Sequence, residues 1–560
     1  MSWRSMAARH GLTLAGFLVL TVVMTAPLAW RGGRSGPVNT GDGQWSMWST
    51  AWVARTLLAD PWRLYDANIF APHPRTLAYS ETNLAGGLLA APAWWTTRDP
   101  YVTYSAAVFL SFFLSAIATF GLVHHLTRHR GAAVVSAVAF AFAPFVVVRL
   151  AHVQLLMTFC LPLALLALHR LVERQSAARV LTLSAALVVA GWCSGYYAIF
   201  TAIAVGLGFL YYGIARGLWR RPRPLIAGAS AIVIAGIAIL PFVLPYLELG
   251  RGDGPFRTIE ESRRYSADWR SYLTSTTRAH RAAIHAFLPF EPSAFPERVL
   301  FPGFVAAALA GVALAWAGRR PPDGRPRRVS AETAGFYALL GGTAAWLSFG
   351  PAGGLYAWLY QAGPVLSMLR APSRFGALVM LALAVLAGLA TAALAGRLRS
   401  LAVAPVAVLL LLGELAAVPF DLRPALDTPA VYRALAALPA GVVAEFPFFF
   451  REQDFHRNTL YMLHSTRHWR PLVNGYSDRV PVNYGETAVA ISTFPSREAF
   501  RLLRERGAKY VVFHLQLYDH RSRAKLLDAL DRYRDYLRPL QREDDVWLYE
   551  IVGWPAVGGT

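Results

Sequence analysis

The chain has 560 residues, of which 55% are apolar and only 16% are charged, and its mean hydropathy is +0.37. A soluble core cannot absorb so large an apolar share, so the composition excludes an ordinary soluble globular protein. The net charge of +21 comes almost wholly from arginine, much of it in short loops, so we interpret it as setting membrane topology rather than binding nucleic acid.

Eleven apolar runs follow along the chain, and we interpret each as a membrane-spanning helix, because a hydrocarbon layer of about 30 Å takes about 20 helical residues to cross. The runs lie near residues 11–30, 102–124, 132–149, 155–170, 180–194, 197–214, 225–246, 301–317, 333–349, 375–395 and 401–419. Residues 191–195 are expected to form a turn between two short spans. The sequence therefore predicts an α-helical polytopic membrane protein with about eleven transmembrane helices.

Arginine clusters recur in alternate short loops of this arrangement, around residues 128–130, 170–179, 216–223, 319–328 and 397–399. By the positive-inside rule these loops face the cytoplasm, and so does the N-terminus. The first span has a basic flank like a signal peptide, but residues 26–29 make a poor cleavage site, so we expect the span to be retained. Asp42 and everything after residue 420 are then predicted to lie outside.

Charge rises abruptly after the last span, which predicts a transmembrane domain at 1–420 and a soluble, extracytoplasmic α/β domain at 421–560. In the second domain we expect strands at 441–446, 509–513 and 546–551, and helices at 496–506 and 521–537. The transmembrane domain has three long outer loops, at 31–100, 247–300 and 350–374. The candidate functional residues lie mainly in these loops and in the second domain.

Asp42 lies in the first outer loop, within Asn-Thr-Gly-Asp-Gly-Gln at 39–44. An acid at the mouth of an apolar bundle is costly to keep unless it binds or reacts, and the flanking glycines are expected to present it on a tight turn. An amphipathic helix is predicted over 44–58, and its tryptophans suit a helix that lies in the membrane interface. The alternative is a belt of tryptophans that only anchors the chain. Glu81, and Glu414 near the outer end of the last span, are second acid candidates; alternatively, Glu414 pairs with an outer-loop arginine.

Basic residues at the outer surface form a second group of candidates. Arg370 and Arg374 stand four apart just before the span at 375–395, and we interpret them as a clamp for a phosphate or diphosphate headgroup, because guanidinium forks match phosphate oxygens. Arg149 and His152 are predicted near the same surface. The competing interpretations are arginines that snorkel to lipid headgroups and, for His152, a structural histidine.

The C-terminal region holds a third group of candidates, in His-Trp-Arg-Pro at 468–471 and Asn-Gly-Tyr-Ser-Asp at 474–478. Sugars are commonly held by aromatic faces together with amide and hydroxyl groups, so Trp469, Asn474 and Tyr476 are candidates for binding an acceptor or a sugar. An ordinary Asn-Gly turn packed by aromatic residues would give the same pattern.

This arrangement resembles the GT-C superfamily of polytopic glycosyltransferases, through Asp42 in the first outer loop after the first span, the interfacial helix and the many-span bundle. Residues 370–375 and 461–477 are similar to those of a largely uncharacterised bacterial group related to that superfamily. The resemblance implies an enzyme of the bacterial inner (cytoplasmic) membrane that takes a sugar from a polyprenyl-phosphate carrier and passes it to an extracytoplasmic glycan, lipid or protein acceptor.

In that chemistry Asp42 would act as the general base, and Arg370, Arg374, Arg149 and His152 would bind the donor phosphate. The chain lacks an Asp-Asp or Asp-Glu pair at Asp42, so a divalent metal is possible but no ligands are assigned to it. The simplest mechanism is a metal-free displacement that inverts the configuration at C1. No other cofactor is implied. Cys160 and Cys193 support neither a disulfide framework nor a metal cluster.

Two other classes of protein remain open at this point. A lipid-linked saccharide transporter or flippase would be expected to place charged groups along a path through the spans, and the spans carry almost none. A non-catalytic envelope assembly protein would use the outer domain for binding, and Asp42 would then be dispensable.

Overall fold

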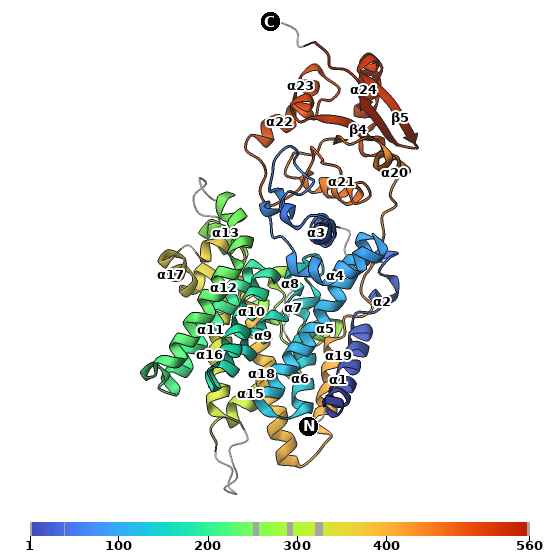
Figure 1. Cartoon of the computed structure of the whole chain (residues 1–560). Coiled ribbons are helices and arrows are strands. Elements are labelled where there is room, and N and C mark those ends of the chain that lie inside the picture. The colour runs from blue at the N-terminus through green and yellow to red at the C-terminus, as the bar shows by residue number, and fades with distance from the viewer. Residues whose placement is uncertain are drawn as a thin grey trace. The chain divides into compact units, whose positions relative to one another are not determined.

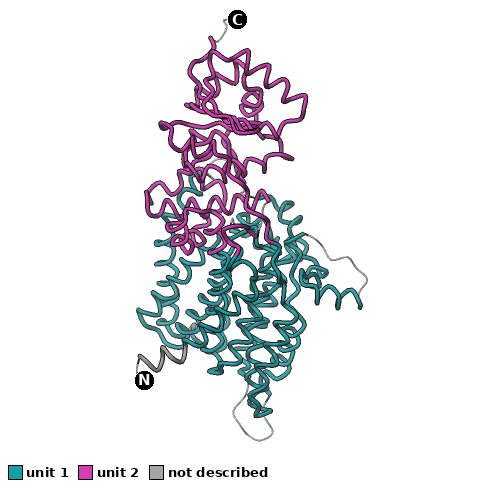
Figure 2. Tube along the Cα trace, turned by 90° about the vertical axis from the view of Figure 1, so that its right-hand side faces the viewer, with its two compact units in different colours: residues 1–30, 107–421 teal, residues 31–106, 422–560 magenta. Residues whose placement is uncertain are grey.

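Figure 1 shows the computed structural model, which describes residues 3–37, 40–249, 257–287, 295–319, 329–363 and 365–556. Asn39 of the predicted Asp42 motif and the arginines of residues 320–328 lie outside these ranges. The chain divides into two compact units, coloured separately in Figure 2. Unit 1 comprises residues 1–30 and 107–421, and unit 2 comprises residues 31–106 and 422–560. The whole of the predicted first outer loop, residues 31–100, therefore belongs to the same unit as the C-terminal region.

Unit 1 is built from helices and contains the apolar runs of the sequence. Its helices, two of which cross the division between the units, are α1 (Trp3–Met24), α2 (Leu28–Arg31), α5 (Pro100–Thr127), α6 (Arg130–Ala141), α7 (Pro144–Val147), α8 (Val153–Leu156), α9 (Cys160–Glu173), α10 (Ala177–Cys193), α11 (Gly195–Ala215), α12 (Pro222–Leu249), α13 (Ile259–Arg264), α14 (Arg278–Phe287), α15 (Phe304–Trp316), α16 (Ala331–Ser348), α17 (Leu355–Ala362), α18 (Gly376–Leu398) and α19 (Val403–Leu415). The α-helical, polytopic class predicted from the sequence is confirmed by this succession of apolar helices.

Five helical segments among the described residues are long and apolar enough, by length and composition, to cross a membrane: Pro100–Thr127, Arg130–Val147, Gly195–Ala215, Pro222–Leu249 and Pro372–Leu398. Four shorter apolar helices, Gly11–Met24, Ala177–Cys193, Phe304–Trp316 and Val403–Leu415, coincide with further runs of the sequence. The number of eleven crossings stays a prediction.

The expected turn at residues 191–195 is present. Helix α10 ends at Cys193 and α11 begins at Gly195, and the Ser194 hydroxyl between them accepts a hydrogen bond from the backbone N–H of Tyr196 at 3.2 Å. A serine that accepts the first free N–H groups of a helix favours a new helix over continuation of the old one. Two helices therefore occupy residues 177–215.

Unit 2 contains a four-stranded sheet in the order β3-β4-β6-β5. The strands are β3 (Val442–Phe446), β4 (Ala508–His514), β5 (Leu537–Glu543) and β6 (Val546–Ile551), and a separate pair consists of β1 (Ser35–Gly36) and β2 (Arg423–Pro424). Strands β3 and β4 are parallel, whereas β6 pairs antiparallel with both β4 and β5. The strands predicted at 441–446, 509–513 and 546–551 are β3, β4 and β6.

The helices that lie wholly within the described residues of unit 2 are α3 (Gly41–Ala59), α4 (Leu84–Thr97), α20 (Ala430–Ala437), α21 (Asn458–Ser465), α22 (Tyr484–Ile491), α23 (Arg497–Glu505) and α24 (His520–Arg532). Ser496 caps α23 as expected, by accepting the N–H of Ala499 at 3.2 Å. The second predicted helix is shorter than expected, because α24 ends at Arg532 and residues from Leu537 onward form β5.

Residues of the first loop are hydrogen-bonded to a segment that runs beside β3 in unit 2. The backbone N–H groups of Phe70 and Ala71 donate to the carbonyls of Asn474 and Leu472 at 3.0 and 2.8 Å. Residues 471–473 in turn pair with Val443 of β3, through bonds of 2.8 Å in each direction. Chain segments that lie far apart in the sequence are thus joined by backbone hydrogen bonds, which satisfy polar groups that burial would otherwise leave without partners.

A buried amide reinforces this junction. Asn68 accepts a hydrogen bond from the Trp48 indole N–H at 3.1 Å and donates to the Ser465 hydroxyl and the Arg470 carbonyl, both at 3.0 Å. The tryptophans of α3 are buried within the protein, and Trp48 is fully buried. The expectation that these tryptophans face the membrane interface is therefore wrong, because their apolar stripe packs inside the fold.

Replacing Asn68 with alanine is expected to destabilise unit 2, because Trp48 and the Arg470 carbonyl would lose their buried partner. We expect a loss of about 2–4 kcal/mol, from about 1–3 kcal/mol per buried group left unsatisfied. The thermal unfolding midpoint of the detergent-solubilised protein should fall by about 5–10 °C.

Thr96→Ala is the matched control, because the exposed Thr96 hydroxyl bonds only carbonyls of its own helix, at 2.9 and 3.1 Å. Equal midpoints for the Asn68→Ala and Thr96→Ala proteins would contradict the role given to Asn68.

Candidate functional site

Asp42 lies in the first turn of α3 and its side chain is exposed. The helix begins because the Thr40 hydroxyl accepts the N–H of Gly43 at 3.4 Å and the Thr40 carbonyl accepts the N–H of Gln44 at 2.8 Å. The expected tight turn is thus the start of a helix, whose positive end favours a carboxylate. A Cβ at Gly41 would stand 2.8 Å from the Cβ of His456, so glycine is needed there for close packing.

Tyr476 donates a hydrogen bond from its hydroxyl to Oδ1 of Asp42 at 2.9 Å. Its ring lies 5.4 Å from that of Phe455, in the 3₁₀ turn Phe455–Arg457 beside Gly41. The preceding residue, Gly475, packs so closely on Phe70 that a Cβ would stand 2.7 Å from the ring. The structure therefore brings together the predicted base and a predicted sugar-binding residue.

Residues after Tyr476 bring a further acid to the first loop. Asp478 accepts a hydrogen bond from the Ser80 hydroxyl at 2.8 Å, and the Arg479 N–H donates to the Tyr79 carbonyl at 3.2 Å. Glu81, the second acid candidate, follows Ser80 and is half-buried. Asp478 is not among the site residues predicted from the sequence, although it ends the same Asn-Gly-Tyr-Ser-Asp segment as the predicted sugar-binding residue Tyr476.

The other two residues predicted to bind sugar have different surroundings. The Asn474 side chain is buried; its Oδ1 accepts the N–H of Glu445 at 2.7 Å and its Nδ2 donates to the Glu445 carbonyl at 3.0 Å. Trp469 packs edge-on against Trp52 and Trp94, with ring centroids 5.5 and 5.6 Å away. Both residues thus help to hold unit 2 together.

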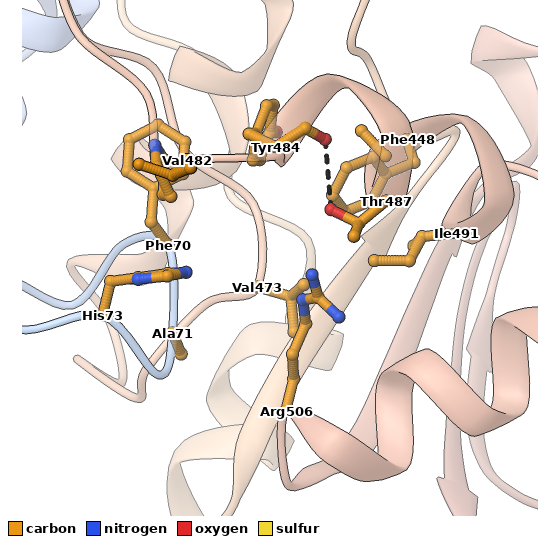
Figure 3. A pocket seen from close by; sticks show the side chains of 12 residues that line it. Phe70, Ala71, His73, Phe448, Val473, Val482, Tyr484, Thr487, Ile491 and Arg506 are labelled. Carbon is orange, nitrogen blue, oxygen red and sulfur yellow. Dashed lines mark hydrogen bonds between the residues drawn. The ribbon is translucent and has the colours of Figure 1, made fainter.

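A small cavity lies in unit 2 behind this region, and Figure 3 shows its lining. Phe455 contacts both Tyr476 and Tyr484, at 5.4 and 5.9 Å, and Tyr484 lines the cavity together with Phe70. The volume of about 20 Å³ has room for one water molecule rather than a sugar.

Three of the predicted phosphate-binding residues gather in unit 1 around Glu297, an acid that is not among the predicted site residues. Glu297, in the 3₁₀ turn Pro296–Arg298, accepts hydrogen bonds from Arg374 at 2.6 and 3.0 Å and from Arg149 at 3.3 Å. Arg149, Arg374 and Glu297 are only 1%, 5% and 8% exposed. His152 is close enough for its charge to act on Glu297, and its backbone N–H donates to the Arg149 carbonyl at 2.9 Å.

Two guanidinium groups share one carboxylate in this cluster, so it carries an excess of positive charge. Burial alone would raise the pKa of Glu297, but the charges of Arg374 and Arg149 and the hydrogen bond from Arg374 outweigh burial and lower the pKa to about 2. The carboxylate is therefore ionised at neutral pH. It fixes the position of both arginines.

Arg370 joins this region through Tyr196. The Tyr196 hydroxyl accepts the backbone N–H groups of Arg370 and Ala371 at 2.9 and 3.1 Å, while the Arg374 guanidinium lies 4.4 Å from the centre of its ring. The Arg370 guanidinium lies 4.9 Å from the ring centre of Tyr265, and its residue is half-buried. Arg370 is thus the more accessible of the two arginines predicted to form the clamp.

Glu414, the other acid candidate, caps a helix. Its carboxylate accepts the backbone N–H groups of Phe304 and Val305 at the start of α15, at 2.9 and 3.1 Å. The same carboxylate lies 3.3 Å from Nε2 of His280. Among the described residues the prediction of an outer-loop arginine partner is therefore wrong, because a histidine and the positive end of a helix take its place.

In the part of the chain that the structure describes, no three His, Cys, Asp or Glu side chains are placed to hold a metal ion.

No sequence profile of a protein family matches this chain, and neither does any curated protein sequence. Solved structures do match. The mycobacterial arabinofuranosyltransferase AftD is 17% identical, with a TM-score of 0.56 over 98% of this chain and 40% of that chain. The archaeal oligosaccharyltransferase AglB of Archaeoglobus fulgidus is 14% identical, with a TM-score of 0.46 over 98% of this chain and 74% of that one.

ArnT from Cupriavidus metallidurans is 12% identical, with a TM-score of 0.39 over 97% of this chain and 98% of that chain. The match to AftD shows the fold: this chain shares the fold of that mycobacterial arabinofuranosyltransferase. The resemblance inferred from Asp42 and the bundle is confirmed at this level. The chain spans less than half the length of AftD.

The Glu297 cluster predicts a pH-dependent stability. The folded-state pKa of about 2 lies below the ordinary value of 4.5, so the contribution of Glu297 is complete above about pH 4.5 and is lost as the pH falls towards 2. Glu297→Gln should lower the stability at pH 7 by about 3–5 kcal/mol, because it leaves two buried arginines without their counter-charge. The unfolding midpoint of the variant should also fall less than that of the parent between pH 5 and pH 3.

Glu260→Gln is the control, because Glu260 forms an exposed pair with Arg263 at 3.1 Å in the same unit. Equal stability and equal pH dependence of the Glu297→Gln protein and the parent would refute the electrostatic role of Glu297.

Proposed function

We propose that this protein is a membrane glycosyltransferase that transfers a sugar from a polyprenyl-phosphate carrier to a glycan, lipid or protein acceptor outside the bacterial inner membrane. The observation that supports the proposal most directly is the exposed Asp42 carboxylate at the start of α3, hydrogen-bonded by Tyr476 at 2.9 Å, in a chain with the GT-C fold. The arabinofuranosyltransferase AftD, which shares that fold, is itself a sugar transferase.

The proposal includes a topology with eleven spans, a cytoplasmic N-terminus and an extracytoplasmic C-terminal region. The alternation of arginine-rich loops supports this orientation. Asp42 would then lie on the side of the membrane where lipid-linked sugars, rather than nucleotide-linked ones, serve as donors.

In the proposed reaction an acceptor hydroxyl attacks C1 of the donor sugar. Asp42 takes the proton of that hydroxyl as the new C–O bond forms, and the bond from C1 to the phosphate oxygen breaks. The carrier leaves as polyprenyl phosphate, so negative charge develops on its oxygens. Tyr476 is a positioning residue in this scheme, because it holds Asp42 and is not assigned a contact with substrate.

The basic residues of unit 1 would stabilise that departing phosphate. Arg149 and Arg374 are held by Glu297, and together these three groups carry one net positive charge. Arg370 is more exposed, so we assign it the direct contact with the phosphate, supported by the charge of the cluster. His152 is assigned a supporting position beside Arg149.

Asp42→Asn is expected to reduce sugar transfer at least about 100-fold while the protein stays folded, because an amide cannot accept the proton. The measurement is incorporation of radiolabelled sugar by membranes supplied with polyprenyl-phosphate sugars. Tyr476→Phe keeps the ring against Phe455 but removes the hydrogen bond to Asp42, so we expect a smaller loss of about 10-fold.

Asp60→Asn provides the matched control, because Asp60 follows the other end of α3 and forms an exposed pair with Arg63 at 3.6 Å. Unchanged transfer by a folded Asp42→Asn protein would remove Asp42 as the base.

Arg370→Ala is expected to lower kcat/KM for the lipid-linked donor about 10-fold or more, since a hydrogen bond to a charged group contributes about 1.5–3 kcal/mol. Arg370→Lys should recover part of the loss, because it keeps the charge but not the planar fork. Steady-state kinetics with varied donor concentration measure the effect.

The comparison variant is Arg270→Ala, which removes an exposed arginine that lies 5.3 Å over the ring of Trp269 in the same unit. The phosphate assignment fails if the Arg370→Ala and Arg270→Ala proteins have the same kcat/KM for the donor.

A further inference from the structure

A second, much larger cavity lies within unit 2, and none of the residues that line it has a role in the proposed reaction. Its volume is about 620 Å³, within the range of about 300–1,000 Å³ that is usual for small-molecule sites. Its walls come from the start of α5, from the segment after β2, from α20 and from the end of α21. The cavity is large enough for one or two sugar rings, in contrast to the cavity of about 20 Å³ behind Tyr476.

The walls of this cavity are fixed by hydrogen bonds within unit 2. The Asp99 carboxylate accepts the backbone N–H groups of Tyr101 and Val102, at 2.8 and 3.0 Å. The Tyr101 hydroxyl accepts the N–H of Leu426 at 3.0 Å, so the start of α5 is tied to the segment after β2. A cavity with such walls is largely preformed, so ligand binding would not be weakened by an entropy cost of ordering the walls.

Two arginines line the cavity without an ion pair. Arg433 of α20 and Arg467 after α21 are both exposed, and the described residues offer neither of them a carboxylate partner. Asp99, which also lines the cavity, accepts hydrogen bonds from backbone N–H groups and forms no ion pair with either arginine. Guanidinium groups that line a cavity and have no carboxylate partner suit an anionic ligand, because their planar forks match carboxylate and phosphate oxygens.

The remaining lining favours a sugar over a bare anion. Asp427 and the hydroxyls of Thr428 and Thr466 can bond to ring hydroxyl groups, and Tyr101 supplies aromatic surface. His464 is buried, and its pKa is lowered to about 3 by burial and by the charges of His514, Arg467 and His468. Its ring is therefore neutral at pH 7 and offers one donor and one acceptor.

We propose that this cavity binds an acidic saccharide, a sugar that carries a phosphate or a carboxylate, with Arg433 and Arg467 on the anionic group and Asp427 on the ring hydroxyls. Binding of the saccharide does not depend on the transferase activity. The further step, that the bound saccharide is part of the acceptor, rests on the proposed function.

The experiment is isothermal titration calorimetry on the full-length, detergent-solubilised protein with four probes: glucose 1-phosphate, glucuronic acid, glucose and inorganic phosphate. We expect the first two to bind at least 10-fold more tightly than the last two. Arg433→Ala combined with Arg467→Ala should weaken binding of both acidic sugars at least 10-fold. Arg497→Ala, which removes an exposed arginine at the start of α23, should leave it unchanged.

Each other outcome overturns part or all of the proposal. Equal binding of inorganic phosphate would make this a simple anion site, and equal binding of glucose would remove the role of the arginines. No binding of either acidic sugar, or binding that survives the double substitution, would overturn the site altogether. The Asp42→Asn protein should bind both acidic sugars like the parent, so a failure of the proposed base is distinguishable from a failure of this cavity.

Discussion

The backbone pairing of residues 68–71 with residues 471–474, and of these with β3, is the interaction on which unit 2 depends. It joins a loop near the start of the chain to a sheet near its end. Asn474 strengthens the junction, because its amide bonds both the N–H and the carbonyl of Glu445 in β3. Tyr476 follows Asn474 by two residues, so this pairing helps to place the hydroxyl that bonds Asp42. The geometry of the candidate base is therefore a consequence of the sheet.

Unit 1 depends on a different constraint, the balance of buried charge around Glu297. A buried guanidinium is costly without a counter-charge, and here two arginines from distant segments meet one carboxylate. The Ser373 hydroxyl adds a hydrogen bond to Glu297 at 3.4 Å. These contacts fix three segments of the unit, and the two guanidinium groups with one carboxylate keep one positive charge in excess.

The sequence predicts local structure well where the signal is local. Apolar runs locate the long helices, and Ser496 marks the start of α23. Strand β5 escaped prediction because it is an edge strand with Pro539 and several polar residues, a composition that edges tolerate and that carries no alternation. The spacing of the α3 tryptophans predicted a helix but not what covers it, since an apolar stripe packs equally well on lipid or on protein.

In the candidate site, too, the sequence predicts individual residues from their neighbours along the chain but not the contacts between distant residues. Asp42 and Tyr476 were both singled out by their own surroundings in the sequence, but their pairing links positions 434 residues apart. Glu297 has no local signal at all, because its arginine partners lie 148 and 77 residues away. Residues whose role comes only from tertiary contacts leave no pattern that a single sequence can show.

Asp42 and Glu414 have different surroundings, although the sequence predicts both as candidate acids of the site. Both carboxylates stand at the N-terminus of a helix, where negative charge is stabilised. Glu414 accepts two backbone N–H groups of α15 and so performs the capping itself. At α3 the Thr40 side chain accepts the N–H of Gly43, so the cap does not require the carboxylate of Asp42. The exposed Asp42 carboxylate instead accepts a hydrogen bond from Tyr476, 434 residues further along the chain, and this contact is the one on which its proposed role as the base rests.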